Sequence, residues 1–490
     1  MEPFISTIEY IIGDEDYGES DRMQRMSLDK LAALMNGNIL VRANNNKIPF
    51  NISQASTPHF KSITFLDIPF KNERAFLAQL KNHDVRCLVT NTSGILNIDR
   101  WSSAGIAVIE AKKLRRAYRD LANFHKKQFN IPFVQVIGSS GKTTTTEMIG
   151  SVLNQKFPTL VTLNNTNSPL GVADNIFRLN KTHRAAVLEV GMKAPGIMRI
   201  TSSLVKPDIG VVTSIHSAHL TRLGSISKII SAKAEMLESL SPVGTLIINW
   251  ADPNCHRFPL SRYKGKIIRY GFSEQCDVWA SDIQRQGFRT HFIVHTRQSQ
   301  FPCTINIIGT YNVGNALAAV AVGLIMRMRP AQIVQGLERF EPIAGRLKVY
   351  TLQNGVVIID DNFNANPDST RMLIDELIPI ALEEPVVLVI GDMERPTPDT
   401  EKYARRVHFN IGRHLAQGTF QHVLAIGVWA GEYVRGALEA GFPREKLSYY
   451  HDVHAAQDEF DNLLKPGNTV VLKASPYTKL TDLRTNSAHK

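Results

Sequence analysis

The stretch FVQVIGSSGKTTTTEMIGSVL, at residues 133–153, constrains the fold more than any other part of the chain. Its first five residues are mostly apolar and predict a buried strand, and the glycine-containing segment after them predicts a turn into a helix. A strand that passes through such a turn into a helix is the setting of a phosphate-binding loop, whose backbone N–H groups approach phosphate oxygens closely. The usual pattern has a further glycine where Val136 stands. A shortened phosphate loop is therefore the prediction, and a plain glycine turn is the alternative.

Two side chains of this loop have the chemistry that nucleotide binding needs. The Lys142 ammonium can lie against the outer phosphates, and the Thr143 hydroxyl can ligate magnesium. The predicted nucleotide-binding residues of the loop are Gly138, Ser139, Ser140, Gly141, Lys142, Thr143 and Thr144.

Short apolar runs alternate with helical stretches on both sides of residue 340. The runs AAVLEV, IGVVTSI and GTLIINW follow the loop, and VVIIDD, PVVLVIGD, HVLAIG and NTVVLKAS follow Pro342. This alternation predicts an α/β protein with mostly parallel sheets that are covered by helices on both faces. Between Lys266 and Ile308, four runs with little helix between them predict an antiparallel appendage, and a helix is expected from Asn312 to Met328.

A chain of 490 residues is too long for one hydrophobic core. We predict three domains: a substrate-binding α/β domain over residues 1–112, a central ATP-binding domain with a parallel sheet over residues 113–340, and a C-terminal Rossmann-like domain over residues 341–490.

Composition bounds the partners and the location of the protein. The net charge of +11 favours polyanionic ligands, but the densest basic segment, KKLRRAYR at residues 112–119, is typical of a solvated helix face, so nucleic acid is not expected. The cysteines are widely separated, which favours buried thiols. The N-terminus lacks the features of a secretory signal, and no apolar run is long enough to cross a bilayer, so we expect a cytoplasmic protein without a transmembrane segment.

The loop and three segments after it resemble the Mur ligases, and most closely the MurF branch of that family. These segments are AVLEVGMKAPGIM, PDIGVVTSIHSAHLTRLGS and ISAKAEMLESL, in the order in which the family has them. The resemblance implies that Glu189 and His219 hold magnesium. It also implies that Lys233 is carbamylated and helps to hold a second magnesium ion.

Later segments carry the resemblance into the last domain. GTYNVGNALAAVAVGL resembles the helix near the adenine, and PIAGRLKVY with VVIIDDNFNANPDST resembles the segments that reach the terminal phosphate. By this resemblance the further ATP-binding residues are Asn312, Asn315, Arg346, Asp361 and Asn364. LVIGDM and VVLKAS resemble segments near the incoming amine, which implicates Asp392, Lys473 and Ser475.

The resemblance implies an ATP-dependent ligase that converts a carboxylate into an acyl phosphate and joins it to an amine. Its implied catalytic residues are Lys142, Lys233, His219 and Arg346, and its cofactors are ATP and Mg²⁺. As a MurF-like enzyme it would add D-Ala-D-Ala to UDP-MurNAc-tripeptide in peptidoglycan precursor synthesis, and we expect it to act as a monomer on small-molecule carboxylate and amino acid or dipeptide substrates.

The region before Lys112 lacks the elements with which this family grips a UDP-sugar. A paralogous ligase for a carboxylate without UDP therefore stays open, as does a non-catalytic ATP-binding module. The basic charge leaves a phosphate-loop NTPase that acts on nucleic acid as a further alternative.

Overall fold

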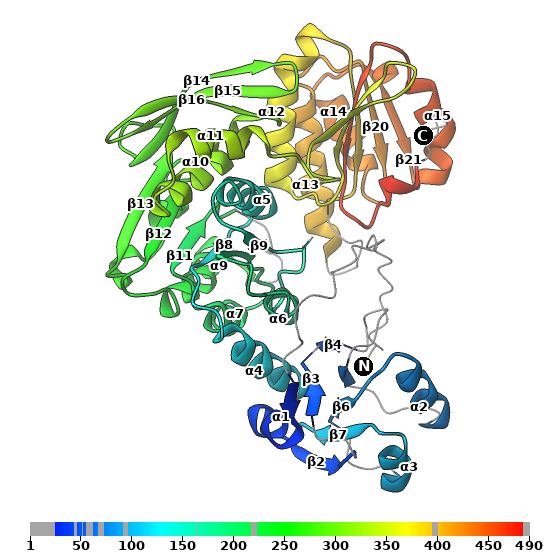
Figure 1. Cartoon of the computed structure of the whole chain (residues 1–490). Helices are drawn as coiled ribbons and strands as arrows, with labels where there is room; N and C mark the ends of the chain where they lie inside the picture. Colours follow the sequence, from blue (N-terminus) through cyan, green and yellow to red (C-terminus); the bar gives the residue numbers. More distant parts are fainter. Residues whose placement is uncertain are drawn as a thin grey trace. The chain divides into compact units, whose positions relative to one another are not determined.

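A computed structural model describes residues 25–43, 47–50, 52–54, 62–66, 73–91, 97–163, 165–216, 223–393 and 400–483. The chain forms two compact units, Met1–Phe124 and His125–Lys490. Figure 1 shows the order of their helices and strands. Within the described ranges, no helix combines the length and the apolar character that crossing a bilayer requires.

The N-terminal unit is a small α/β module. Its described strands form a five-stranded sheet of order β2-β7-β6-β5-β4, parallel except for β2, together with the two-stranded pair β1-β3. Leu80, Leu88 and Trp101 are fully buried in its core. Its elements are β1 (Arg25–Ser27), α1 (Leu28–Met35), β2 (Asn38–Val41), β3 (Lys47–Pro49), β4 (Ile52–Gln54), β5 (Ile63–Leu66), α2 (Glu73–Asn82), β6 (Cys87–Thr90), α3 (Ile98–Ser103), β7 (Ala107–Glu110) and α4 (Leu114–Lys126).

The second unit contains two sheets, and we call the part around the first of them the central region. This sheet has the order β16-β15-β14-β13-β12-β11-β8-β10-β9. Its elements are β8 (Phe133–Ile137), α5 (Lys142–Leu153), β9 (Thr159–Val161), α6 (Pro169–Phe177), β10 (Ala185–Glu189), α7 (Ile197–Val205), β11 (Ile209–Val212), α9 (Ile226–Ala234), β12 (Thr245–Asn249), β13 (Lys266–Gly271), β14 (Val278–Gln286), β15 (Arg289–Thr296), β16 (Gln300–Ile305), α10 (Thr310–Ile325) and α11 (Pro330–Glu338).

Strand β8 lies between β10 and β11, so the chain changes direction across the sheet at this strand. Ligands of open α/β sheets bind at the carboxyl ends of the strands beside such a switch point. The predicted phosphate loop leaves β8 at this place. Helices α10 and α11 pack against α5 and keep the loop's helix against the sheet.

The antiparallel appendage expected from Lys266 to Ile308 is only partly right. Strand β13 pairs in parallel with β12, and the start of β14 pairs in parallel with β13. The antiparallel pairs are β14-β15 and β15-β16, and these strands extend the same sheet. The connection at residues 250–265 holds two short 3₁₀ turns and is long enough to return the chain to the same edge, so β13 continues the parallel order without an α-helix before it.

We call the part around the other sheet the C-terminal region. Its order is β17-β18-β22-β19-β20-β21, and every neighbouring pair is parallel except β17-β18. Its elements are β17 (Lys348–Thr351), β18 (Val357–Asp361), α12 (Pro367–Glu383), β19 (Val386–Gly391), α13 (Glu401–Leu415), β20 (His422–Ile426), α14 (Gly431–Glu439), β21 (Leu447–Tyr450), α15 (Val453–Leu463) and β22 (Thr469–Lys473).

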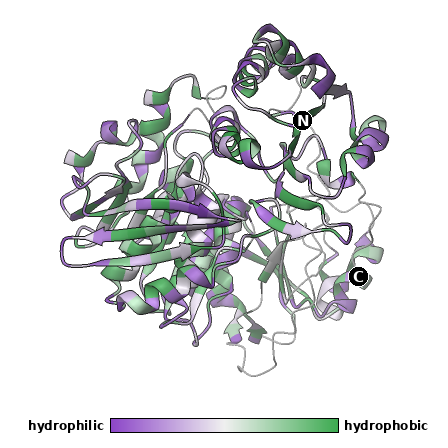
Figure 2. Ribbon diagram, turned by 90° about the horizontal axis from the view of Figure 1, so that it is seen from above, coloured by the Kyte–Doolittle hydropathy of each residue, from purple (hydrophilic) through white to green (hydrophobic). Residues whose placement is uncertain are grey.

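The predicted α/β class and the parallel sheets are confirmed. Figure 2 shows helices that carry both hydrophilic and hydrophobic residues, as expected when one face of a helix covers a sheet. The four cysteines are buried free thiols, as their spacing indicated.

Candidate functional site

The predicted phosphate loop is a tight strand-to-helix turn. Gly141 precedes α5 with a φ of 78°, which favours glycine, and a Cβ there would lie 2.6 Å from Asn315 Oδ1. A Cβ on Gly138 would lie only 1.9 Å from Thr213 Oγ1. The loop is fixed to the end of β11, because Ser139 N–H donates to Ser214 O (2.7 Å) and Thr213 Oγ1 donates to Ser140 O (2.6 Å). The prediction of a strand, a loop and a helix is confirmed here.

Lys142, at the start of α5, lies near charged groups from two other segments of the chain. Burial lowers the pKa of Lys142, the nearby Glu189 carboxylate opposes this shift, and the Arg346 guanidinium adds to it. Arg346 Nη2 is 3.5 Å from Thr143 Oγ1. Lys142, Thr143, Glu189 and Arg346 are therefore brought together, although they are far apart in the sequence.

Glu189 ends β10 and is 1% exposed. Its Oε1 accepts a hydrogen bond from Asn167 Nδ2 (2.7 Å), whereas Oε2 is buried and no described residue donates a hydrogen bond to it. A buried carboxylate oxygen in this state costs free energy unless a cation or donor satisfies it. Glu189 and the Thr143 hydroxyl thus offer the hard oxygen ligands that Mg²⁺ prefers.

Two residues near Glu189 were missed from the sequence. Asn167 orients the carboxylate, and its only sequence signal was the asparagine-rich NNTNSP segment before α6. Glu147, on α5, has its pKa raised to about 7 by burial and by the neighbouring Glu189 carboxylate. Two carboxylates, Glu147 and Glu189, therefore lie close together here, whereas the sequence motifs indicated only Glu189.

Lys233 lies in the last turn of α9 and is 2% exposed. Burial and the nearby Lys142 ammonium lower its pKa to about 7. A lysine with such a pKa is uncharged in a large fraction of molecules near neutral pH, which is the nucleophilic form of an amine.

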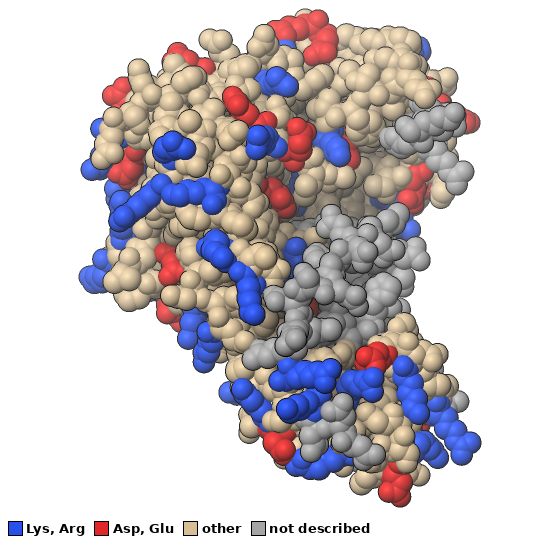
Figure 3. Space-filling model, viewed as in Figure 1, with Lys and Arg blue, Asp and Glu red and all other residues tan. Residues whose placement is uncertain are grey.

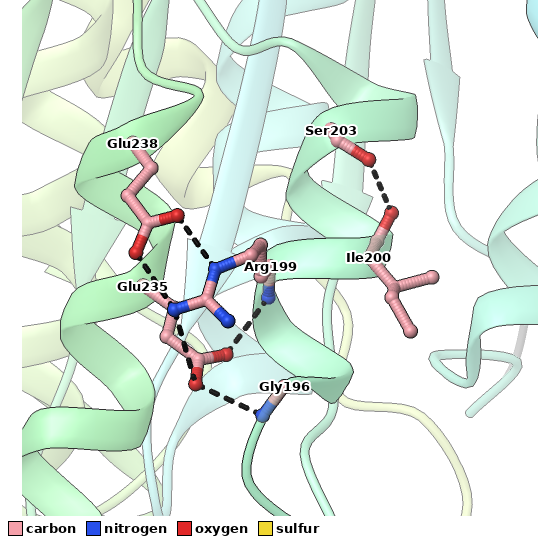
Figure 4. Close-up of polar contacts among 6 residues, drawn as sticks. All are labelled: Gly196, Arg199, Ile200, Ser203, Glu235 and Glu238. Atoms are coloured by element: carbon pink, nitrogen blue, oxygen red, sulfur yellow. Dashed lines mark hydrogen bonds and ion pairs between the residues drawn. The ribbon is translucent and has the colours of Figure 1, made fainter.

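The end of α9 is anchored by the glutamates that follow Lys233. Glu235 accepts hydrogen bonds from the backbone N–H groups of Gly196 (2.9 Å) and Arg199 (3.0 Å) at the start of α7. The Arg199 side chain pairs with Glu238 (2.6 Å), as Figure 4 shows. This network fixes the backbone beside Lys233 to the neighbouring helix.

Asn312 and Asn315 lie inside the first turns of α10, whose N-cap is Gly309, so they do not cap the helix. Asn315 Nδ2 donates to Asn312 Oδ1 (3.0 Å), and Asn315 Oδ1 accepts from Thr145 Oγ1 (3.0 Å) on α5. Both are buried. They connect α10 to the helix of the phosphate loop, and their contact with adenine stays a prediction.

The C-terminal region brings Arg346, Asp361 and Asn364 together. The Arg346 guanidinium lies 4.3 Å from the centre of the Phe363 ring. The buried Lys473 Nζ lies 2.5 Å from Asp361 Oδ2 and donates to the Asn364 carbonyl oxygen (3.0 Å). Lys473 therefore orients the segment predicted to hold ATP, and its role towards an amine stays a prediction.

Asp392 and Ser475 lie at the carboxyl ends of β19 and β22. Both Asp392 carboxylate oxygens accept backbone N–H groups, those of Val428 and Trp429, at 2.9 Å each. Burial nevertheless raises the pKa of Asp392 to about 6. Ser475 Oγ is buried and has no hydrogen-bond partner among the described residues. Their role towards an amine stays a prediction.

His219 lies outside the described residues, so its predicted place beside the metal is untested. Among the described residues, no group of three or more His, Cys, Asp or Glu side chains could hold a metal ion. The predicted magnesium ligands do not need such a group, because they include a threonine and a modified lysine.

The N-terminal unit has a hollow of its own, of about 470 Å³. It is lined by Asn91, Lys112, Lys113, Leu114, Arg115, Arg116 and Arg119. The half-buried Arg119 has its pKa lowered by burial and by the neighbouring Arg116 and Arg115 cations. Figure 3 shows Lys and Arg side chains gathered on this unit. The basic side chains other than Arg119 are exposed, as expected of a solvated helix face, and they also line this hollow.

Known protein families match the central region and the C-terminal region separately. Residues 136–323 match the Mur ligase middle domain, and residues 345–476 match the Mur ligase glutamate ligase domain. The UDP-N-acetylmuramoyl-tripeptide–D-alanyl-D-alanine ligase of Haemophilus influenzae is 30% identical over 64% of this chain and 68% of its own length. That of Bacillus subtilis is 28% identical over 77% and 80%. A crystal structure of MurF from Acinetobacter baumannii matches with a TM-score of 0.80 and 27% identity, and covers 94% of this chain and 98% of its own.

Proposed function

We propose that this chain, which belongs to the Mur ligase family, is an ATP-dependent ligase that adds D-alanyl-D-alanine to a UDP-N-acetylmuramoyl-tripeptide in peptidoglycan precursor synthesis. One observation carries the chemical part of this proposal. The phosphate loop, Lys142, Glu189 and Arg346 meet in one place, and Arg346 comes from the C-terminal region. The substrates follow from the relatives, whose names state this reaction.

ATP is proposed to bind with its phosphates on the turn between β8 and α5. The start of α5 presents backbone N–H groups and the positive end of the helix dipole to an anion. Lys142 and Arg346 add two cations, and the Arg346 guanidinium lowers the pKa of Lys142, so an anion bound between them would favour the charged form of Lys142. An arginine at this place stabilises the negative charge that develops on the transferred phosphoryl group.

Magnesium fits the residues present. Glu189, with its unsatisfied buried oxygen, and the Thr143 hydroxyl would hold it, with His219 and a carbamylated Lys233 as further ligands. The low pKa of Lys233 supports its modification, because carbamylation needs the uncharged amine to attack carbon dioxide. When bound, the metal would neutralise charge on the phosphates of ATP.

The carboxylate of the tripeptide is proposed to take the terminal phosphoryl group of ATP. Oxide is a poor leaving group, whereas phosphate is a competent one, so the acyl phosphate makes attack by the amine feasible. The amine nitrogen forms the new bond to the acyl carbon, loses a proton, and the bond between that carbon and the phosphate oxygen breaks. Approach of the C-terminal region, which supplies Arg346, would exclude water that could hydrolyse the acyl phosphate.

The hollow of the N-terminal unit is proposed to bind the diphosphate of the UDP-sugar. Its five cations, from Lys112 to Arg119, face a volume large enough for a diphosphate, and their mutual repulsion favours an anionic ligand. In this proposal the hollow takes the place of the UDP-binding elements that the sequence before Lys112 lacks.

A second function is supported by the same unit. The two matching domains begin at residue 136, so the N-terminal unit lies outside both. A paralogous ligase with the same chemistry and a different carboxylate substrate, without UDP, would have this pattern.

The test is to incubate the full chain with UDP-MurNAc-tripeptide, D-Ala-D-Ala and Mg-ATP, and to score phosphate release and product mass. We expect a product heavier than the tripeptide substrate by one dipeptide less water, and no product from Lys142→Ala. Phosphate release only with another carboxylate would favour the paralogue, and undiminished ligation by Lys142→Ala would refute the assigned site.

A further inference from the structure

Helix α10 begins beside the phosphate loop, but its first turn is capped from the C-terminal region. Its N-cap residue, Gly309, has no side chain to accept a hydrogen bond. The Thr310 N–H instead donates to Glu376 Oε1 (2.6 Å), which lies in the middle of α12. The first N–H groups of a helix lack partners within the helix, and a carboxylate there is favoured by the helix dipole. The start of α10 thus depends on where α12 lies.

Glu376 caps Thr310, and the backbone of the same first turn carries Asn312, from which hydrogen bonds lead to α5. Asn312 accepts a hydrogen bond from Asn315 (3.0 Å), and Asn315 accepts one from Thr145 on α5 (3.0 Å). Asn315 also lies so close to Gly141 that a Cβ there would overlap its amide oxygen. A change in the first turn of α10 would therefore be transmitted to the N-terminal turn of α5, where the phosphates are proposed to bind.

We propose that Glu376 is a positioning residue for nucleotide binding, which holds the phosphate loop in its binding geometry through α10, Asn312 and Asn315 when the C-terminal region is docked. This inference rests on the proposed function, because it takes ATP as the ligand of the loop. It makes docking of the C-terminal region and nucleotide affinity two parts of one equilibrium, since each favours the other.

The structure supplies a matched control on the same helix. Glu383, at the end of α12, pairs with Arg285 on β14, so this pair also joins the two regions. Within the described part of the chain, neither Arg285 nor Glu383 forms a hydrogen bond or an ion pair with α10 or with the loop. Arg285 has a second partner, Glu384 (3.5 Å), so Glu383→Gln removes a charge from the same helix but leaves the two regions joined and the contacts of α10 intact.

The experiment measures the Kd of a non-hydrolysable ATP analogue, with magnesium, for the full-length wild type, Glu376→Ala, Glu376→Gln and Glu383→Gln. Loss of a helix cap of this kind should weaken binding about fivefold in Glu376→Ala. Glu376→Gln keeps the accepting oxygen and should recover most of the affinity, and Glu383→Gln should stay within about twofold of the wild type. Circular dichroism checks that each variant is folded.

A kinetic measurement separates positioning from general damage. Glu376→Ala should raise the KM for ATP and leave the KM for the UDP-linked substrate unchanged. The double variant with Asn315→Ala should raise the KM for ATP by less than the product of the two single increases, because both residues act on one chain of contacts.

Equal losses of nucleotide affinity in Glu376→Ala and Glu383→Gln would overturn the inference. So would a double variant with Asn315→Ala in which the two increases in the KM for ATP simply multiply. A wild type that binds no nucleotide would refute the proposed function instead. A wild type that binds while Glu376→Ala binds equally well would refute the positioning role alone.

Discussion

Asp392 offers a quantitative test of how this site balances burial against hydrogen bonding. Its carboxylate is 3% exposed and accepts two backbone N–H groups. The hydrogen bonds favour the ionised form, but burial outweighs them and raises the pKa from 3.8 to about 6. Because the folded pKa lies above the unfolded one, the folded state binds more protons between these values. Stability should therefore fall as the pH rises through this window.

The expected size follows from the two pKa values. Between pH 4 and pH 7 the ionisation of Asp392 should lower the free energy of unfolding by about 2 kcal/mol. Asp392→Asn removes the titration but keeps a side chain of the same shape. From pH 4 to pH 7 the variant should therefore become more stable relative to the wild type by about 2 kcal/mol of unfolding free energy. Any constant cost of the amide cancels in that change.

Urea unfolding at several pH values gives the difference directly. The backbone N–H of Trp429 donates to Asp392. In a variant whose other three tryptophans are replaced, the fluorescence of Trp429 therefore reports on unfolding of this region. A difference independent of pH would show that burial does not raise the pKa of Asp392. A change of opposite sign would show that the two N–H groups outweigh burial, and either result would refute the reasoning.

Further predictions concern the loop, the metal and the hollow. Gly141→Ala should weaken binding of the ATP analogue at least about tenfold, measured by calorimetry, because its Cβ would overlap a buried amide. Gly355 has a similar positive φ but open space around it, so Gly355→Ala should bind normally and lose only about 1 kcal/mol of stability. Equal binding by both variants would contradict this prediction. Glu189→Gln should lower kcat at least about a hundredfold and raise the magnesium concentration for half-maximal rate, and an unchanged magnesium profile would exclude Glu189 as a ligand. Arg116→Glu should raise the KM for the UDP-linked substrate about tenfold and leave the KM for ATP unchanged. The increase should be smaller at high salt. Equal changes in both KM values would argue against binding of the UDP-linked substrate in the hollow.

The sequence was most informative where one short segment determines both the local structure and the chemistry. The run from Phe133 to Leu153 predicted a strand, a loop and a helix, and all three are present. Glu189 was identified by its resemblance to a family motif, and the structure places it at the end of a strand that pairs in parallel with the loop's own strand. Local periodicity and turn chemistry are properties of neighbouring residues, so they can be read from the sequence.

What escaped prediction depends on contacts between distant segments. Asn167 orients Glu189 across 22 positions of sequence, and Glu376 caps α10 across 66. The ion pair of Lys473 with Asp361, on the neighbouring strand, was likewise not predicted. The order of strands was also beyond the sequence, because β13 reads as any short apolar strand and only its neighbours decide that it runs parallel. Such features follow from the register and packing of whole elements.

The central claim is that the acid substrate is activated as an acyl phosphate, and oxygen transfer tests it most directly. The UDP-linked tripeptide would carry ¹⁸O in its terminal carboxylate, and the phosphate released during ligation would be analysed by mass spectrometry. Because the bond between carbon and the bridging oxygen breaks when the amine attacks, we predict one ¹⁸O atom in each phosphate released. Phosphate without ¹⁸O, at a normal yield of ligated product, would contradict the account.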